Sequence, residues 1–458
     1  MLFSSLIFLW LFLPIVLILY FISKEKFKNI ILLLASIFFY AWGEPVYVLV
    51  MLFSIIFNYI IGLKIATSNY LKNKIFFIFG IFINILLLGF FKYYNFLIEN
   101  INYIFNIKLS LISLSLPIGI SFYTFQSISY LVDVYKKQVE PQKNILNMGL
   151  FISFFPQLIA GPIIKYYDIN EQINNRIHTI DKFNEGCRRF LIGLAKKVLI
   201  SNILAKIADD IFSLNFENID CFTAWIGILS YTMQIYFDFS GYSDMAIGLG
   251  KIFGFNIKEN FNYPYLATSI KDFWRKWHIS LSSWFKEYIY IPLGGNKCSV
   301  IKNYRNIIIV FFLTGLWHGA SWNFIIWGLI HGFFSIFERL VNIEKILKFK
   351  FLQHIYTMFI VIIAWVFFRA DNLTLAFKYL KAMFNFKDFN FNSYYFSKEF
   401  IIFFALSILC CGVLNNIEFK YKNKIIKFLY PFFYLFIAII SIFFLVGNTY
   451  NPFIYFRF

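Results

Sequence analysis

The sequence predicts an all-α polytopic integral membrane protein, and three observations support this fold class. Of the 458 residues, 60% are hydrophobic and only 14% are charged, whereas soluble domains devote about a quarter of their residues to charge. Apolar stretches long enough to cross a bilayer recur along the chain. Lys and Arg cluster in the short loops between these stretches. We therefore expect about 11 to 12 transmembrane helices together with re-entrant and interfacial helices.

The predicted spans are apolar runs of roughly 17 to 25 residues. The clearest are Leu2 to Ile22, Val46 to Leu63, Ile75 to Phe91, Tyr356 to Phe368 with its flanks, and Tyr430 to Val446. The first run has no basic region before it and no small-residue cleavage site. We therefore expect it to remain as an anchor and not to be removed as a signal peptide.

The formal charge of +18 predicts membrane topology here and not binding to nucleic acid. Basic clusters are expected to lie in cytoplasmic loops. They comprise Lys24, Lys26 and Lys28, then Lys345, Lys348 and Lys350, and finally Lys420, Lys422, Lys424 and Lys427. The stretch from Arg369 to Glu399 and both ends of the chain are then expected outside. Two external ends require an even number of crossings.

The middle third of the sequence differs from the regular spans around it. Pro117, Pro156, Pro162, Pro264 and Pro292 interrupt short apolar runs that contain many Gly and Ser residues. Broken helices are tolerated at membrane depth only where the protein buries them or where they line a wet cavity. We therefore place the functional centre there, within one membrane domain covering residues 1–458.

Metal and disulfide chemistry find no support in the cysteine pattern. The five cysteines, Cys187, Cys221, Cys298, Cys410 and Cys411, lack the spacing of metal ligands. Phosphate-loop, dinucleotide, HExxH and GxSxG motifs are also missing from the sequence. We predict no metal and no resident cofactor.

Residues 234–331 hold the richest polar motifs, and His318 is the strongest candidate among them. It follows the apolar run from Ile307 to Trp317, which at 1.5 Å per residue spans about 16 Å, half of a 30 Å hydrocarbon core. Unless polar flanks extend it, we expect this helix to end inside the membrane, followed by a short connection at Gly319 and a second apolar helix. An ionisable group at that depth indicates function. The alternative is a buried histidine that is hydrogen-bonded for packing.

His278 lies in a segment whose apolar and charged residues alternate in a way that fits one helix along the membrane interface. Its charged face suits either a catalytic role or an ordinary lipid-headgroup anchor. Asp238 and Asp244 each lie in a polar break, where they could serve as ligands, bases or helix caps, and of these roles we expect capping. Structural or surface roles are expected for the remaining histidines, His178, His331 and His354.

The order of motifs resembles the membrane-bound O-acyltransferase family, in its bacterial branch that O-acetylates envelope polysaccharides such as alginate and peptidoglycan. The similarity covers nearly the whole chain. It is carried by Tyr40 to Trp42, Leu116 to Gln126, Phe154 to Pro162, Tyr236 to Asp244, and the segments around His278 and His318.

This resemblance implies that His318, in its Trp-His-Gly setting, is the catalytic histidine and that His278 occupies the second motif position. It also implies a central tunnel between a cytoplasmic entrance for the acyl donor and an outward-facing cavity. The last six residues, 453–458, resemble a C-terminal motif of envelope O-acylation systems, in which the tyrosine, here Tyr455, is implicated as an acyl carrier. A belt of interfacial aromatics is the alternative for these residues.

The expected reaction takes an acetyl group from cytoplasmic acetyl-CoA and delivers it to the outer side of the bacterial inner membrane. A periplasmic SGNH or esterase-like O-acetyltransferase partner would pass it to an envelope polysaccharide, most simply peptidoglycan. Alginate or another exopolysaccharide is the alternative acceptor. A transporter of an acylated or lipid-linked precursor also suits broken helices, although no internal repeat supports it. A noncatalytic scaffold would leave the Trp-His-Gly segment without a reason.

Overall fold

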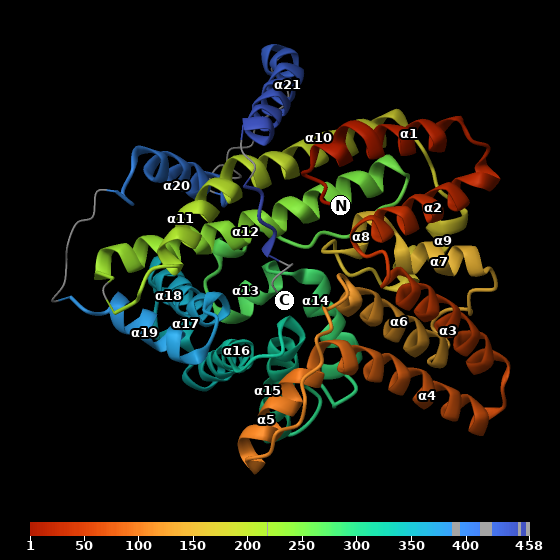
Figure 1. Ribbon diagram of the computed structural model, residues 1–458, viewed down its shortest axis with the longest axis horizontal. Coiled ribbons are helices and arrows are strands. Elements are labelled where there is room, and N and C mark those ends of the chain that lie inside the picture. The colour runs from red at the N-terminus through yellow and green to blue at the C-terminus, as the bar shows by residue number, and fades with distance from the viewer. Residues whose placement is uncertain (218, 387–393, 413–423, 448–449, 455–458) are drawn as a thin grey trace. The chain divides into compact units, whose positions relative to one another are not determined.

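The computed structural model describes residues 1–217, 219–386, 394–412, 424–447 and 450–454 (Figure 1). Within these ranges all regular secondary structure is helical, which confirms the predicted all-α class. The residues group into two compact units. One comprises residues 1–190 with 245–258, and the other comprises residues 191–244 with 259–458.

The first unit contains the N-terminal helices. They are η1 (Phe8–Phe12), α1 (Leu13–Ile22), α2 (Glu25–Gly43), α3 (Val48–Thr67), α4 (Tyr70–Leu88), η2 (Gly89–Tyr93), α5 (Tyr94–Phe105), α6 (Ile120–Tyr135), α7 (Ile145–Ser153), α8 (Phe155–Leu158), α9 (Tyr166–Asn174) and most of α10 (Ile180–Ala195).

Polar residues and glycines hold helices α3, α4 and α6 of this unit together. The buried amides of Asn58 on α3 and Asn84 on α4 donate to each other over 3.2 and 2.8 Å. A Cβ atom at Gly62 would lie 2.4 Å from the Tyr130 hydroxyl of α6. In lipid, helices associate through interhelical hydrogen bonds and through close packing at small residues. Apolar contact alone does not favour association there, because the lipid tails are equally apolar.

The second unit contains the C-terminal helices and most of the longest helix, α12 (Cys221–Ile252). The others are η3 (Lys196–Ser201), α11 (Asn202–Phe212), η4 (Pro264–Leu266), α13 (Ile270–Lys276), α14 (Ile279–Phe285), η5 (Lys286–Tyr290), α15 (Val300–His318), α16 (Trp322–Val341), α17 (Ile343–Ile346), α18 (Lys350–Arg369), α19 (Leu373–Met383), α20 (Lys398–Cys410) and α21 (Lys424–Gly447).

Helices α15 and α16 form a tight hairpin that contacts α18 through α16 (Figure 1). A Cβ atom at Gly315 would lie 2.3 Å from the Phe324 carbonyl oxygen, and one at Gly328 would lie 2.3 Å from the Phe311 carbonyl oxygen. The absence of side chains at these two glycines therefore lets the helix backbones touch. Ser321 begins α16 by accepting a hydrogen bond from the Asn323 N–H.

Six helical segments in the described part of the chain are long and apolar enough to cross a membrane. They are Glu25–Gly43, Val48–Thr67, Tyr70–Phe105, Trp322–Val341, Lys350–Arg369 and Leu429–Gly447. The expected number, about 11 to 12, is larger. The 32-residue helix α12 has the length of a span but buries polar side chains such as Gln234, Asp238 and Asp244, and the Phe8–Ile22 segment is apolar but shorter.

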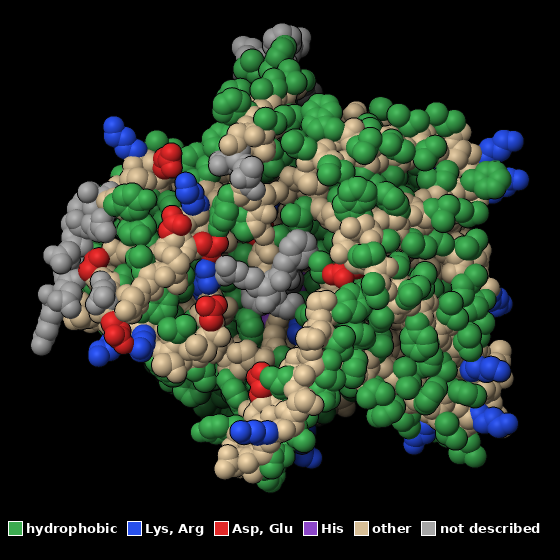
Figure 2. Space-filling model, in the orientation of Figure 1, with side chains coloured by type: hydrophobic (Ala, Val, Ile, Leu, Met, Phe, Trp, Pro, Cys, Tyr) green, Lys and Arg blue, Asp and Glu red, His purple; other side chains and the backbone are tan. Residues whose placement is uncertain are grey.

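The surface has the character expected of a protein that sits in lipid. Hydrophobic side chains cover most of the face shown in Figure 2. Large apolar residues such as Trp10, Ile22 and Phe443 are 65%, 81% and 74% exposed, which in water would be a strong aggregation liability. The protein is a multi-pass membrane protein.

The prolines of the middle third interrupt helices as predicted. Pro117 and Pro162 lie in non-helical chain, Pro156 in the four-residue α8, Pro264 in the short η4, and Pro292 in a turn after η5. A proline in a helix interior removes a hydrogen bond and clashes with the preceding turn. The chain around these prolines is therefore made of short helices and loops, whereas α12, which contains no proline, continues for 32 residues.

Candidate active site

His318 is the last residue of α15 and is buried among aromatic rings from three helices. Its ring centroid lies 4.8 Å from that of Trp317, 4.9 Å from that of Trp327 on α16, and 5.1 Å from that of Phe368 on α18. Only 4% of the residue is exposed. The hairpin between α15 and α16 thus buries an imidazole against aromatic rings.

The predicted end of this helix is confirmed, but the predicted half-length helix is wrong. Helix α15 begins at Val300, so its 19 residues span about 28 Å at 1.5 Å per residue. The first turns of α15 contain polar residues, including Asn303 and Arg305, and these lengthen the helix beyond the apolar run. A Cβ atom at Gly319 would lie 2.2 Å from the Phe324 ring, which explains why the connection needs glycine.

His278 is fully buried and lies at a break between two short helices. Its φ of 43° places it in the left-handed region, which is uncommon for a residue other than glycine. The predicted continuous interfacial helix through this segment is therefore wrong, because the chain turns at His278 between α13 and α14. Strained backbone of this kind is found where the surrounding structure over-determines it, often at functional sites.

Asn260 determines the orientation of His278 and was missed by the sequence reasoning. Its side-chain oxygen accepts hydrogen bonds from the Ser280 N–H at 3.1 Å and the Ser280 hydroxyl at 2.8 Å. That same oxygen lies 3.2 Å from His278 Nδ1. Because an amide oxygen only accepts, Nδ1 must carry the proton in this contact. The Ile279 N–H also donates to the Asn260 carbonyl oxygen at 2.9 Å, so this residue stabilises the turn itself.

The lone pair of neutral His278 is consequently on Nε2. In the described part of the chain Nε2 is buried and has no hydrogen-bond partner. The ring packs edge-on against Phe239 of α12 at 4.6 Å. A buried acceptor without a partner costs free energy, so a ligand that donates a hydrogen bond to Nε2 would remove this cost.

Trp317 joins the two histidines into one cluster. Its ring lies 5.9 Å from that of His278 and 4.8 Å from that of His318. The structure thus brings together two residues that are forty positions apart in the sequence. Both are held by packing on helices and helix ends, which keeps them in fixed positions.

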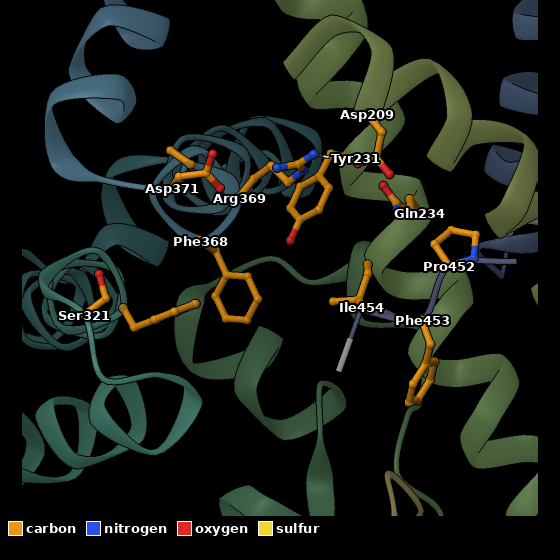
Figure 3. A pocket seen from close by; sticks show the side chains of 12 residues that line it. Asp209, Tyr231, Gln234, Ser321, Phe368, Arg369, Asp371, Pro452, Phe453 and Ile454 are labelled. Carbon is orange, nitrogen blue, oxygen red and sulfur yellow. Dashed lines mark hydrogen bonds and ion pairs between the residues drawn. The ribbon is translucent and has the colours of Figure 1, made fainter. Parts of the chain in front are cut away.

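A cavity of about 180 Å³ lies next to this cluster. Phe368, which packs against His318, forms part of its wall (Figure 3). Its lining is polar at Asp209, Gln234, Ser321, Arg369 and Asp371, and apolar at Tyr231, Phe324, Phe368, Pro452, Phe453 and Ile454. Arg369 and Asp209 form an ion pair at 2.5 Å. The cavity therefore combines polar groups with an aromatic wall that adjoins His318.

Asp238 and Asp244 are not helix caps, contrary to the prediction. Both lie inside the continuous helix α12, where Asp238 pairs with Lys197 at 2.6 Å and Asp244 with Lys196 at 2.7 Å. The expected polar break is absent because lysines from η3 satisfy these carboxylates. Lys197 gave no signal in the sequence, since its partner is forty-one residues away.

The other predicted residues fall in different places. His331 of α16 is fully buried and stacks on Phe273 at 5.9 Å. His354 contacts the Ala267 carbonyl oxygen, and His178, in the first unit, contacts the Tyr20 hydroxyl. Tyr455 lies outside the described residues, although Phe453 and Ile454 immediately before it line the cavity.

Comparisons with known proteins point to one family. A model of the membrane-bound O-acyltransferase family matches residues 139–377. The chain is 46% identical to the probable alginate O-acetylase of Pseudomonas aeruginosa over 393 residues, which covers 84% of this chain and 75% of that protein. It is 41% identical to the peptidoglycan O-acetyltransferase of Helicobacter pylori over 420 residues, which covers 84% and 80%. It is 30% identical to the teichoic acid D-alanyltransferase of Bacillus subtilis over 239 residues, which covers 48% of this chain and 60% of that protein.

Proposed function

We propose that this chain, which belongs to the membrane-bound O-acyltransferase family, moves an acetyl group from cytoplasmic acetyl-CoA to the outer side of the bacterial inner membrane for O-acetylation of an envelope polysaccharide. Membership of the family makes the chain a membrane-bound acyltransferase. The observation that supports the proposal most is the pairing of His318 and His278 around Trp317, beside a cavity and within the matched residues.

In the proposed reaction a hydroxyl oxygen attacks the thioester carbonyl carbon of the donor. Neutral His318 takes the hydroxyl proton as general base, a role that contributes roughly 10² to 10⁴ in rate. The new carbon–oxygen bond forms as the carbon–sulfur bond breaks. The proton then passes from His318 to the leaving thiolate, which departs as the free thiol of CoA.

His278 suits an orienting role better than a polarising one. Because Asn260 accepts the Nδ1 proton, neutral His278 presents only the acceptor Nε2 to a bound ligand. An acceptor can orient a bound ligand by accepting a hydrogen bond from a donor group other than the attacking hydroxyl, whose single proton passes to His318. It cannot donate to the thioester carbonyl oxygen.

The cavity supports an acceptor-side role for this part of the protein. Its polar lining includes Arg369 and Asp371, which the basic-loop pattern predicts to lie on the outer side. Tyr455, directly after the cavity residue Ile454, is the proposed first acceptor. A phenol has a reference pKa near 10 and therefore needs a base such as His318. A periplasmic SGNH or esterase-like partner would move the acetyl group onward.

The proposed final acceptor is peptidoglycan. Alginate is a second candidate because the probable alginate O-acetylases reach 46% identity, against 41% for the peptidoglycan enzyme. Mass analysis of wall fragments and of secreted polysaccharide after deletion of the gene separates these two acceptors. Loss of acetyl esters from wall fragments alone supports peptidoglycan, and loss from the secreted polysaccharide alone contradicts it.

Replacing His318 tests the assignment of the base. His318→Ala should lower the rate at which envelope acetyl esters form by roughly 10²- to 10⁴-fold. The amount of protein in the membrane should stay unchanged. His178→Ala is the matched control, because that histidine belongs to the other compact unit and should leave acetylation intact. Normal acetylation in the His318 variant would rule out its role.

Replacing the tyrosine hydroxyl tests the relay. Tyr455→Phe removes one oxygen atom and keeps the aromatic ring, so it should abolish acetylation of the polysaccharide while thiol release from acetyl-CoA slows for lack of an acceptor. Acetylated peptide carrying Tyr455 should be detectable by mass spectrometry in the unmodified protein. Undiminished polysaccharide acetylation in the variant would remove the relay.

A further inference from the structure

The segment from Tyr450 to Ile454 is bound by side chains that lie more than two hundred residues earlier in the chain. Asn202 donates to the Asn451 side chain at 3.1 Å, and the Tyr450 hydroxyl donates to Asp209. Both partners lie on α11. The segment is therefore attached to the second unit by specific polar contacts in addition to its hydrophobic ones.

The segment also binds a buried ion pair, which Lys197 of η3 forms with Asp238 of α12. The two charged groups are 2.6 Å apart, and their side chains are only 3% and 2% exposed. A Cβ atom at Gly241 would lie 2.8 Å from the Gly193 carbonyl oxygen. The close approach permitted by this glycine brings α12 against the end of α10, directly before η3, and so sets Asp238 beside Lys197.

Both members of the pair also bind the main chain of the C-terminal segment. Lys197 Nζ donates to the Pro452 carbonyl oxygen, and the Ile454 N–H donates to Asp238 Oδ2 at 2.8 Å. Buried ions are stable only when their remaining hydrogen-bonding capacity is satisfied. Here backbone atoms two residues apart supply part of that capacity. Phe453, between them, packs against Tyr242 with ring centroids 4.9 Å apart.

We propose that the Lys197–Asp238 pair is a clamp that positions the C-terminal segment and holds Pro452 to Ile454 at the cavity. The purpose of the clamp rests on the proposed role of Tyr455 as acyl carrier, whereas its existence does not. Lys197 and Asp238 are positioning residues in this proposal. They bind main-chain atoms. They therefore fix the position of the segment along α12 independently of the side chains that the segment carries.

A cysteine placed in the segment measures whether the clamp is closed. Ile454 is 6% exposed, so the thiol of an Ile454→Cys variant of the full chain in detergent should react slowly with a maleimide. Labelling is quantified peptide by peptide with mass spectrometry. The native Cys221, which is 2% exposed in the same unit, reports global unfolding in the same sample.

Opening the clamp requires a variant that does not leave a single charge buried. Removing one partner of a buried pair is strongly destabilising, but replacing both with apolar residues is often neutral. We therefore combine Lys197→Met with Asp238→Leu. Labelling at position 454 should rise by roughly tenfold or more, because few contacts would then oppose local opening, while Cys221 stays protected. Lys196→Met, which removes only the neighbouring ion pair to Asp244, is the matched control and should leave position 454 protected.

The outcomes separate the clamp from the relay. Unchanged labelling at position 454 in the double variant overturns the clamp, as does a parallel rise at Cys221. Selective labelling together with loss of polysaccharide acetylation supports the clamp and its purpose. Selective labelling with normal acetylation supports the clamp and contradicts its purpose in acetyl transfer, and Tyr455→Phe then tests the carrier role by itself.

Discussion

At the scale of single residues, the candidate site depends on an asparagine as much as on its histidines. Asn260 is fully buried, and its side-chain oxygen contacts His278 and Ser280 while its amide nitrogen donates to Ser243 at 3.1 Å. This arrangement fixes both the ring orientation and the tautomer of His278. A residue that acts only through another can still control rate, because small errors of position are costly in catalysis.

The Asn260→Ala variant should lower acetyl transfer on the order of 10²-fold by releasing the His278 ring. Residues that act as a unit give non-additive effects. The double variant with His278→Ala should therefore be no slower than His278→Ala alone. Initial rates of thiol release with purified protein measure both effects, and additive losses would show that Asn260 acts independently of His278.

Gln234 on α12 offers a second test at this scale. Its side-chain oxygen is buried, lines the cavity and has no hydrogen-bond partner among the described residues. Gln234→Leu should slow transfer by about tenfold, the worth of one hydrogen bond of roughly 1.4 kcal/mol to the acceptor. The thermal unfolding temperature in detergent should stay equal or rise, because an unsatisfied polar group is removed. A lower unfolding temperature would assign Gln234 a structural role instead.

At the scale of elements, the hairpin of α15 and α16 positions His318. Its backbones touch at Gly315 and Gly328, and Phe311 and Phe324 supply the facing carbonyl groups. Because carbonyl oxygens of a helix cannot move aside as side chains can, the distance between the helices is set by the absence of two side chains. The position of His318 at the end of α15 follows from that distance.

Gly328→Ala should separate these helices and destabilise the protein by about 1 to 3 kcal/mol, the usual cost of overpacking. Gly89→Ala is the matched control, since no atom lies within 4 Å of a Cβ atom built at that glycine. The thermal unfolding temperature in detergent and the rate of acetyl transfer should both fall for Gly328→Ala. Neither should fall for Gly89→Ala. Equal stability of the two variants would contradict the close packing.

At the scale of the whole molecule, the family assignment and a transporter predict different chemistry. Purified protein in detergent should release free thiol from acetyl-CoA in a reaction that stops when His318 is replaced by Ala. A transporter has no reason to break the thioester. Colorimetric thiol detection measures this directly, and a complete lack of release when the chain and its acceptor are present would exclude the acyltransferase reaction.

The sequence by itself determined the features that depend on local composition and local pattern. Apolar runs predicted the helices that begin near Val48 and Lys350, because any segment of that length in lipid must satisfy its own backbone hydrogen bonds. Gly319 marked the short connection between α15 and the apolar helix that follows it, because glycine favours turns over helix interiors. The sequence also indicated His318 as the candidate base through its Trp-His-Gly setting, and that assignment stays a prediction.

Only the tertiary structure decided the features that depend on contacts between distant residues. The break at His278 is held by Asn260, the carboxylates of α12 are satisfied by lysines of η3, and the segment before Tyr455 is bound by Asp238. No local pattern encodes these contacts, because each requires two segments to meet through packing. The physical reason is that the free energy of a buried polar group depends on its partner in space and not on its neighbours in sequence.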